Sequence, residues 1–174
     1  TADAIAREET HRLRALLEKE HFDAVVASTP ENVTYLSDYW GLSHWARRGT
    51  QVYAVAWNES ERSVDVVMPT ALADLVTDAI AERSRAHGYG RFVIAAEGVL
   101  EPGEARLALL ADDMSMREPQ HVLAELLRVG LTRGGRVAIE TAGLAAGAAE
   151  LFAHELPDVE FVPAEPLLAR CRAV

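Results

Sequence analysis

The order of apolar and polar positions divides the chain into stretches typical of helices and stretches typical of strands. Leu13, Leu16 and Leu17 lie at helical spacing within an Arg/Glu-rich segment, which predicts an amphipathic helix over residues 3–20. The apolar run at 23–28 has the length of a short buried strand. The chain therefore opens with a helix that leads directly into a sheet.

The next part of the chain has the pattern of a hairpin followed by a helix. Apolar runs at 51–57 and 63–68 are separated by a short polar segment, so we expect two antiparallel strands there. After Thr70, which suits the N-cap position, apolar residues recur at helical spacing until Gly88. This periodicity predicts a helix between Thr70 and Gly88, and it is the clearest helical pattern in the sequence.

The second half of the chain continues to alternate between the two patterns. Strands are expected at 91–96, 136–140 and 159–162, and helices at 103–114, 119–129, 144–152 and 167–172. Strands that alternate with helices, together with one hairpin, indicate an α/β fold: a mixed β-sheet of about five to six strands flanked by helices. The length of 174 residues fits a single domain over residues 1–174.

Composition and charge narrow the possible functions. Hydrophobic residues make up 49% of the chain and charged residues 25%, as in a globular protein. The net charge of −10 argues against a nucleic-acid binder, which usually carries a basic face. No apolar run reaches the roughly 18 residues of a membrane helix, and the first residues lack the apolar core of a secretory signal. We therefore expect a cytoplasmic protein that binds neither nucleic acid nor a membrane.

Cysteine and histidine give little support for chemistry within the chain. The lone Cys171 excludes an internal disulfide and ends an apolar helical pattern, where packing is its expected role. His121 with Glu125, and Glu150 with His154, have helical spacing, but a zinc site takes three or four protein ligands. We interpret both pairs as surface helix pairing and expect no metal site and no catalytic residue in this chain. Three other histidines are interpreted as solvated positions: His11, His21 and His87.

Two glycines follow a predicted strand and open a predicted helix, as a phosphate-binding turn would. They are Gly143 and Gly147, in the stretch TAGLAAG. This stretch lacks the G-x-G-x-x-G spacing that lets a backbone approach a pyrophosphate. We therefore interpret the two glycines as allowing the helix to pack closely on the sheet, and we expect no nucleotide.

The segment from Tyr39 to Arg48 differs from the rest of the chain. Aromatic residues, a histidine and two arginines crowd a stretch that contains a glycine and has no clean period, which predicts a loop. Loops on a rigid sheet often carry recognition, and aromatic and arginine side chains are enriched where proteins bind one another. Alternatively, the aromatic side chains fold back onto the core and the arginines are solvated. The candidate site residues are Tyr39, Trp40, His44, Trp45, Arg47 and Arg48.

The stretch FDAVVASTPENVTYLSDYW, residues 22–40, resembles the start of the amino-terminal domain of the creatinase/prolidase (Xaa-Pro peptidase) family. In that family an amphipathic helix, an Asp-Ala strand, a Pro-x-Asn turn and a Tyr-Leu-(Ser/Thr)-Gly segment follow one another. The corresponding parts here are residues 7–18, Asp23-Ala24, Pro30-Glu31-Asn32 and Tyr35-Leu36-Ser37. Asp38 stands where the family commonly has glycine.

The stretch GRVAIETAGLAAGAAELFAHELPDVEFVPAEPLLARCRAV, residues 135–174, resembles the end of the same domain. The family has a Val-(Gly/Ala)-Ile-Glu strand, a helix, a Leu-Pro pair and a Leu-Leu…Arg segment that precedes the catalytic domain. The matching positions here are Val137 to Glu140, Leu156-Pro157, Leu167-Leu168, Arg172 and Val174. The middle of the chain, about 60–130, matches only in the order of its elements.

This resemblance implies the fold of the family's amino-terminal domain, with its ribonuclease H-like motif, and a non-catalytic role. In the family, two Asp, one His and two Glu of a following pita-bread domain hold two divalent metal ions, so none of these ligands maps onto a residue of this chain. We therefore expect the metal ions, Mn, Co or Zn, to lie in a catalytic domain beyond this chain. The chain alone is expected to be inactive and to be part of a longer metallopeptidase or related hydrolase, and a stand-alone gene stays open.

The resemblance also implies partners. In the family this domain supports dimer formation and helps to wall the active site, often that of the neighbouring subunit. The expected partners are a second copy of the chain in a homodimer, and the catalytic domains of the same polypeptide and of the neighbouring subunit. The segment from Tyr39 to Arg48 would cap the substrate, with Arg47 or Arg48 facing its acidic end. The substrate stays open between an Xaa-Pro peptide, creatine and another small amide, and the alternative function is a stand-alone protein-interaction module.

Overall fold

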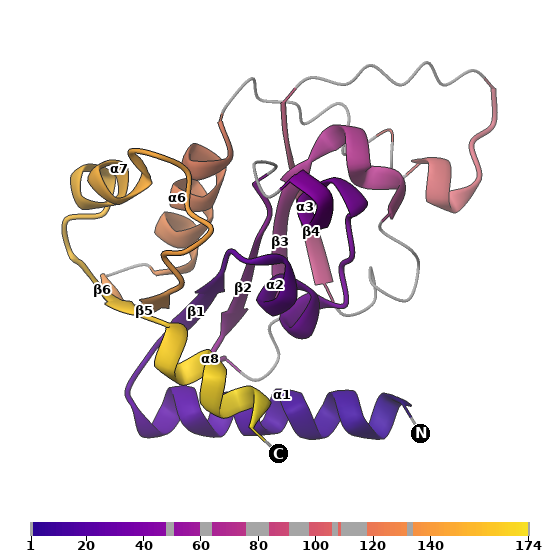
Figure 1. Ribbon diagram of the computed structural model, residues 1–174. Coiled ribbons are helices and arrows are strands. Elements are labelled where there is room, and N and C mark those ends of the chain that lie inside the picture. Colours follow the sequence, from indigo (N-terminus) through magenta and orange to yellow (C-terminus); the bar gives the residue numbers. More distant parts are fainter. Residues whose placement is uncertain are drawn as a thin grey trace.

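The computed structural model describes residues 2–47, 51–59, 64–75, 84–90, 98–105, 108, 118–131 and 134–173. Within these residues the chain forms a six-stranded mixed sheet with helices on both faces, as the sequence predicts (Figure 1). The strands are β1 (Ala24–Ala27), β2 (Tyr53–Trp57), β3 (Val64–Pro69), β4 (Ser84–Tyr89), β5 (Gly135–Ile139) and β6 (Val159–Pro163). The helices are α1 (Ala2–Lys19), α2 (Pro30–Ser37), α3 (Leu42–Arg47), the 3-10 helix η1 (Thr70–Leu75), α6 (Pro119–Gly130), α7 (Ala148–Glu155) and α8 (Glu165–Arg172).

The strands lie in the order β4-β3-β2-β1-β5-β6. The pairs β1–β2 and β2–β3 are antiparallel, which confirms the predicted hairpin, whereas β1–β5, β3–β4 and β5–β6 are parallel. Ala24 of β1 pairs with Trp57 on one side and with Val137 on the other. Because β1 and β5 run in the same direction, their carboxyl ends lie next to each other, and the candidate site is built there.

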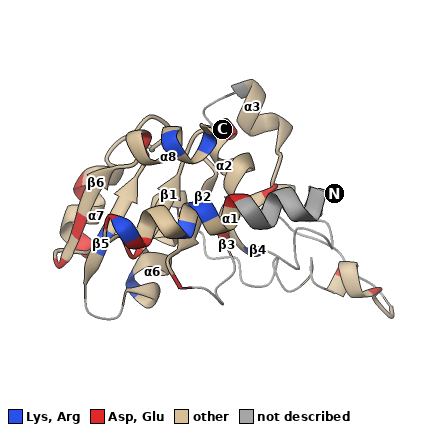
Figure 2. Ribbon diagram, turned by 90° about the horizontal axis from the view of Figure 1, so that it is seen from below, with Lys and Arg blue, Asp and Glu red and all other residues tan. Residues whose placement is uncertain are grey.

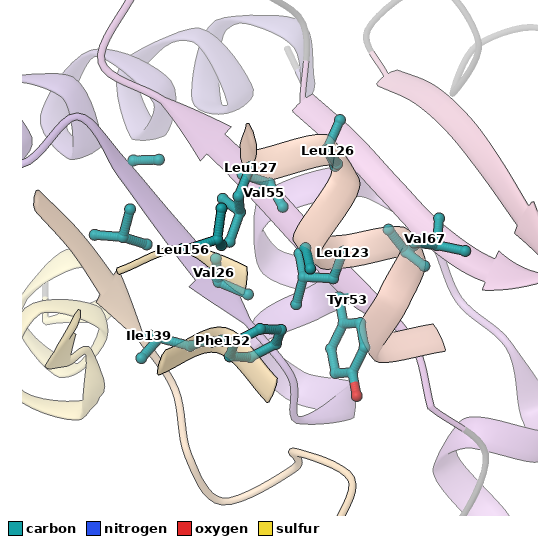
Figure 3. Close-up of a cluster of buried hydrophobic side chains, with 14 of the residues drawn as sticks. Val26, Tyr53, Val55, Val67, Leu123, Leu126, Leu127, Ile139, Phe152 and Leu156 are labelled. Atoms are coloured by element: carbon teal, nitrogen blue, oxygen red, sulfur yellow. The ribbon is translucent and has the colours of Figure 1, made fainter. Parts of the chain in front are cut away.

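Helices α6 and α7 cover one face of the sheet. Alternate strand residues, among them Val26, Val55 and Ile139, point to this face and pack against Leu123 of α6 and Phe152 of α7 (Figure 3). None of these five side chains is more than 5% exposed. The apolar residues of the predicted helix at 119–129 therefore contact the strands as expected.

Helices α1, α2 and α8 cover the opposite face. Val25 and Ala138 point to this side and pack with Leu17 of α1 and Leu168 of α8, while Val33 of α2 packs in an adjoining cluster. All four residues of β1 are buried. A strand that is covered on both faces reads as a continuous apolar run, which is why β1 shows no alternation in the sequence.

The two ends of the chain contact each other on this second face. Helix α8 contacts α1. Helix α1 contains Arg and Lys residues, and α8 contains Arg170 and Arg172 (Figure 2). The Arg12 guanidinium donates to the carbonyl groups of Cys171 (3.5 Å) and Ala173 (3.3 Å), and the Tyr35 hydroxyl donates to the Cys171 carbonyl (3.0 Å). The Cys171 side chain is buried, which confirms its packing role. None of the described helices is long and apolar enough to cross a membrane.

The helix predicted between Thr70 and Gly88 is wrong over its final part. Residues Ser84–Tyr89 form β4, which pairs in parallel with β3 and places Gly88 opposite Met68. The start of the stretch is the short helix η1, and residues 76–83 lie outside the described residues. Helix propensities differ by less than about 1 kcal/mol per residue, so the backbone ladder with β3 can override them.

The remaining predictions divide into three groups. The helices expected at 3–20, 119–129 and 167–172 are confirmed as α1, α6 and α8. The strands expected at 136–140 and 159–162 are confirmed as β5 and β6. The strand expected at 91–96 lies outside the described residues, as does most of the helix expected at 103–114. The helix expected at 144–152 begins later, at Ala148, because Gly147 before it has a left-handed φ of 77°.

Candidate functional site

Helix α2 and the residues after it carry the segment predicted as a recognition loop. The segment is not a loop throughout, because Leu42–Arg47 form the short helix α3, in which the amides of His44 and Trp45 donate to the Gly41 carbonyl. A helix of this length is too short to show a period in the sequence. The structure thus corrects the secondary structure predicted for this segment.

The chain makes a tight turn between α2 and α3. Asp38 has a left-handed φ of 58°, and its amide donates to the Thr34 carbonyl. The Thr34 hydroxyl donates to the Tyr39 carbonyl, and the Tyr39 amide donates to the Ser37 hydroxyl. Glycine adopts this backbone conformation most easily, and Asp is one of the few other residues that tolerate it. This explains how Asp38 can stand where the resemblance places glycine.

Neighbouring side chains of this segment point in opposite directions. Tyr39 is 1% exposed and His44 is 4% exposed, whereas Trp40 is 51% exposed and Leu42 is 63% exposed. The His44 Nε2 atom lies 3.3 Å from the Ser28 carbonyl oxygen at the end of β1. The interpretation that the aromatics fold back onto the core therefore holds for Tyr39 but not for Trp40. The buried side chains of Tyr39 and His44 fix the segment in place, and the apolar side chains of Trp40 and Leu42 are exposed on its surface.

Trp45 is partly exposed and completes the displayed group. Its indole Nε1 is buried and has no hydrogen-bond partner in the described part of the chain, and the same holds for Ser43 Oγ. We call Trp40, Leu42 and Trp45 the Trp40 surface. Arg47 is the last residue of α3, and its side chain lies outside the described part, as does the whole of Arg48.

A buried carboxylate lies behind this segment, at the carboxyl end of β5. Glu140 is 3% exposed. Its Oε2 accepts hydrogen bonds from the amides of Ser28 (2.7 Å) and Thr29 (2.8 Å). Its Oε1 accepts from the Thr29 hydroxyl (2.9 Å) and from Asn32 Nδ2 (2.6 Å). We call this set of contacts the Glu140 network.

The Glu140 network joins the two motifs that carry the family resemblance. Asn32 belongs to the Pro-x-Asn motif, which forms the first turn of α2 rather than an isolated turn, and Glu140 ends the Val-(Gly/Ala)-Ile-Glu strand. In the sequence both motifs indicate only the family, and their contact was not predicted. The sequence did contain one signal for this contact. Glu140 directly follows the strand β5, and the Ser-Thr-Pro stretch that begins α2 directly follows β1. Parallel pairing of the two strands brings these two strand ends together.

Gly143 fits closely against the same strand end. Its amide donates to Ser28 Oγ (3.1 Å), and a Cβ at this position would lie 2.2 Å from the Ser28 carbonyl oxygen. Gly143 is therefore required by a close backbone approach to β1, whereas Gly147, with no atom near its Cβ position, serves a positive φ. The prediction that both glycines allow a helix to pack on the sheet is wrong in this detail.

A second buried carboxylate lies on the face covered by α6. Asp65 is 2% exposed and accepts hydrogen bonds from Trp57 Nε1 (2.6 Å) and His87 Nε2 (2.8 Å). His87 was expected to be solvated, but it lies in β4 and pairs with Asp65 at a side-chain exposure of 27%. The prediction for His87 is therefore wrong, because it depended on the helix that β4 replaces.

The hydroxyl groups of Tyr53 and Tyr89, near the start of β2, are held in their neutral form. Burial raises the pKa of Tyr53 to about 12, although a hydrogen bond from the Ala145 amide opposes the shift. Burial also raises the pKa of Tyr89, whose hydroxyl donates to the Gln51 carbonyl at 2.7 Å. Burial raises the pKa of the Cys171 thiol in the same way. These shifts disfavour each group as a base or nucleophile at neutral pH.

The helix pairs considered as metal ligands lie on α6 and α7. Glu125 forms an ion pair with Arg128, which also binds Glu155 of α7 at 2.8 Å, while Glu150 and His154 are exposed. Among the residues that the structure describes, no group of three or more His, Cys, Asp or Glu side chains could hold a metal ion.

A mixed sheet covered on both faces, with a carboxylate buried where two parallel strands end, defines a three-layer α/β domain. The chain belongs to the Creatinase/Prolidase N-terminal domain family, whose model matches residues 10–174. The resemblance noted in the sequence is thereby confirmed. No curated protein matches the chain.

Several solved structures share this fold. An Xaa-Pro aminopeptidase from Streptococcus pyogenes has a TM-score of 0.61 at 11% identity, and the match covers 98% of this chain and 99% of that chain. The N-terminal domain of the cytoplasmic peptidase PepQ from Mycobacterium tuberculosis has a TM-score of 0.55 at 15% identity, with 95% and 98% covered. A prolidase from Thermococcus sibiricus has a TM-score of 0.59 at 14% identity, with 97% of this chain covered but only 37% of the prolidase. At these identities the likeness shows the fold alone.

Proposed function

We propose that this chain is the non-catalytic N-terminal domain of a metal-dependent Xaa-Pro peptidase or creatinase-like hydrolase. In this proposal it supports a homodimer and helps to wall the active site of the neighbouring subunit. The two metal ions, Mn, Co or Zn, belong to a catalytic domain that follows it in the same polypeptide. The family match and the prolidase of which this chain covers only 37% support the proposal. The similar N-terminal domain of the cytoplasmic peptidase PepQ supports a cytoplasmic location.

The observation that carries the proposal is the contrast between anchored and displayed side chains in residues 39–45. Tyr39 and His44 are almost fully buried, while Trp40 and Leu42 are more than half exposed. Exposing a large indole and a leucine two positions apart in the chain is unfavourable in water, and exposed apolar side chains held on a fixed backbone are a feature of binding surfaces. A surface of this kind needs a partner, and the active-site cleft of a neighbouring subunit is the partner we propose.

Arg47 or Arg48 would hold the acidic end of the substrate, because a guanidinium binds a carboxylate with two parallel hydrogen bonds.

The test uses the full-length protein, in which this chain is followed by its catalytic domain. Trp40, Leu42, Arg47 and Arg48 are replaced by Ala one at a time, and kcat, KM and the melting temperature are measured. We expect Trp40→Ala and the substitution of the arginine that binds substrate to lower kcat/KM by an amount equivalent to about 1–3 kcal/mol. The melting temperature should stay nearly unchanged because Trp40 is exposed.

Val129→Ala is the matched control. Val129 is 66% exposed on α6, which covers the other face of the sheet, so its replacement removes an exposed apolar side chain far from the Trp40 surface. Unchanged kinetics in all four variants would refute the role in the active site. A gene without a downstream segment carrying two Asp, one His and two Glu would instead favour the alternative, a stand-alone protein-interaction module.

A further inference from the structure

The Glu140 carboxylate takes the place of a side-chain cap at the start of α2. Thr29 occupies the N-cap position of this helix, yet its hydroxyl makes no capping hydrogen bond to the helix. That hydroxyl donates to Glu140 Oε1 instead, and the amides of Ser28 and Thr29 donate to Oε2. A negative charge at a helix N-terminus is favourable because the helix dipole is positive there. The residue directly after β5 thus binds the chain at the point where α2 begins.

Asn32 fixes the direction of the helix as well as its start. Its Nδ2 donates to Glu140 Oε1 at 2.6 Å from the first turn of α2. The carboxylate therefore accepts hydrogen bonds from three residues at the start of α2. The donors are the amide of Ser28, the amide and hydroxyl of Thr29, and the side-chain amide of Asn32. Contacts at several points along a chain restrict its rotation as well as its position, which a single hydrogen bond does not.

Two routes connect the network to the Trp40 surface. The first is the backbone of α2, which runs into the hydrogen-bonded turn at Asp38 and so into Tyr39 and Trp40. The second is Ser28, whose amide binds Glu140 and whose carbonyl oxygen lies 3.3 Å from His44 Nε2 in α3. Both ends of the displayed segment are thereby tied to the same carboxylate.

We propose that Glu140 is a positioning residue: its buried carboxylate holds α2, Ser28 and His44 so that the Trp40 surface is presented in one orientation. Glu140 itself lies too deep to touch a substrate, at 3% exposure. The kinetic consequence rests on the proposed function, whereas the structural consequence concerns this chain alone. Replacing the carboxylate should therefore move Trp40 and Trp45 before it affects more distant parts of the sheet.

The experiment labels the three tryptophans of the chain with fluorine and records their 19F resonances in the folded protein. Glu140→Gln keeps the shape of the side chain but loses the charge and replaces one acceptor by a donor. Thr29→Val removes a single contact and serves as the milder variant if Glu140→Gln does not fold. We expect both to shift or broaden the Trp40 and Trp45 resonances. Amide exchange in α2 and α3 should rise by about tenfold relative to α1 and α8.

Asp65→Asn is the matched control, because it also removes a buried carboxylate that accepts two side-chain hydrogen bonds. Its contacts are with Trp57 and His87, so it should shift the Trp57 resonance and leave those of Trp40 and Trp45 in place. If Glu140 only stabilised the fold, Glu140→Gln and Asp65→Asn would affect the Trp40 and Trp45 resonances alike. Glu140→Gln and Thr29→Val proteins that fold with unchanged Trp40 and Trp45 resonances would overturn the inference.

Kinetics of the full-length protein separate this inference from the proposed function. In Thr29→Val we expect KM to rise more than kcat falls, since a misplaced wall weakens substrate binding first. Altered Trp40 resonances with normal kinetics would confirm the positioning role and contradict the role in the active site. Kinetics that depend on Trp40 but resonances that ignore Glu140 would contradict the positioning role alone.

Discussion

The Asn32 Nδ2 atom lies 2.6 Å from Glu140 Oε1, although 108 positions separate the two residues in the chain. Asn32 lies in the first turn of α2 and Glu140 follows β5, so the contact links an element on the face of α1 and α8 to the central part of the sheet. The carboxylate is buried, and its two oxygens accept four hydrogen bonds from three residues. Each donor lost from this set leaves a charged group in the interior with less compensation.

Replacing Asn32 should therefore reduce stability. We expect Asn32→Ala to lower the free energy of unfolding by about 1.5–3 kcal/mol, the range for a hydrogen bond to a charged group. Urea denaturation followed by circular dichroism measures this change. Asn58→Ala, in the polar turn after β2, should change stability by less than about 0.5 kcal/mol. Equal effects of the two substitutions would show that the bond between Asn32 and Glu140 contributes nothing.

Gly143 should not tolerate a side chain. A Cβ there would lie 2.2 Å from the Ser28 carbonyl oxygen and 2.6 Å from its carbon, and backbone atoms cannot turn aside as a side chain can. We expect Gly143→Ala to lower the free energy of unfolding by about 1–3 kcal/mol. Gly103→Ala is the control, because a Cβ at Gly103 meets no atom within 4 Å. A Gly143→Ala protein as stable as the control would mean that the strand end can move away freely.

Stability should fall at alkaline pH. The pKa of Tyr53 is raised from 10.0 to about 12, so the folded chain keeps a phenol proton that the unfolded chain has already lost. This contribution is fully present below pH 10 and is lost as the pH rises from 10 through 12, with a size on the order of 2 kcal/mol. Tyr53→Phe should flatten the pH dependence of unfolding in this window. The pKa of Tyr35 is raised as well, but this residue is only half-buried, so Tyr35→Phe should have a smaller effect. Because the pKa of Tyr89 is raised as well, some alkaline loss should remain in the Tyr53→Phe protein. A loss that is equally steep with and without Tyr53→Phe would contradict the contribution of Tyr53.

The isolated chain should have no hydrolytic activity. The residues of the Glu140 network and of the Trp40 surface do not form a metal site that could activate a water molecule. We therefore expect neither cleavage of Xaa-Pro dipeptides nor hydrolysis of creatine after Mn²⁺, Co²⁺ or Zn²⁺ is added. Calorimetry should detect no stoichiometric, tight metal binding. His121→Ala and His154→Ala proteins provide the comparison: tight binding that either substitution abolishes would mean that the helix pairs are ligands after all.

The sequence predicted those elements whose residues are buried in a regular pattern. The apolar run of β1 has the length of a buried strand, and the leucines of α1 and α6 recur at helical spacing, so the strand and both helices are confirmed. β4 could not be predicted in this way, because Ser84–Tyr89 is a strand through its pairing with β3 and not through an apolar pattern. A pairing partner that lies outside a local window leaves no periodicity within it.

The same limit applies to the candidate site. Composition identified the segment from Tyr39 to Arg48 as unusual, but it could not tell which aromatic side chains point inward. The outcome depends on the left-handed turn at Asp38, which turns Tyr39 into the core and Trp40 outward. Glu140 was visible only as a motif residue, since its role depends on the parallel pairing of β1 with β5.

The pairing of β1 with β5 has a consequence for how the chain folds. Strands β1, β2 and β3 form an antiparallel meander from neighbouring parts of the chain. By contrast, β1 pairs with β5 through residues such as Ala24 and Val137, which are separated by most of the length of the chain. Closing the longer loop costs more chain entropy, and non-local strand pairing slows folding, so we expect β5 to join a meander that has already formed. Contacts made after the rate-limiting step govern how fast a protein unfolds rather than how fast it folds. The carboxyl end of β5 is then the part of the molecule that determines the lifetime of the folded state.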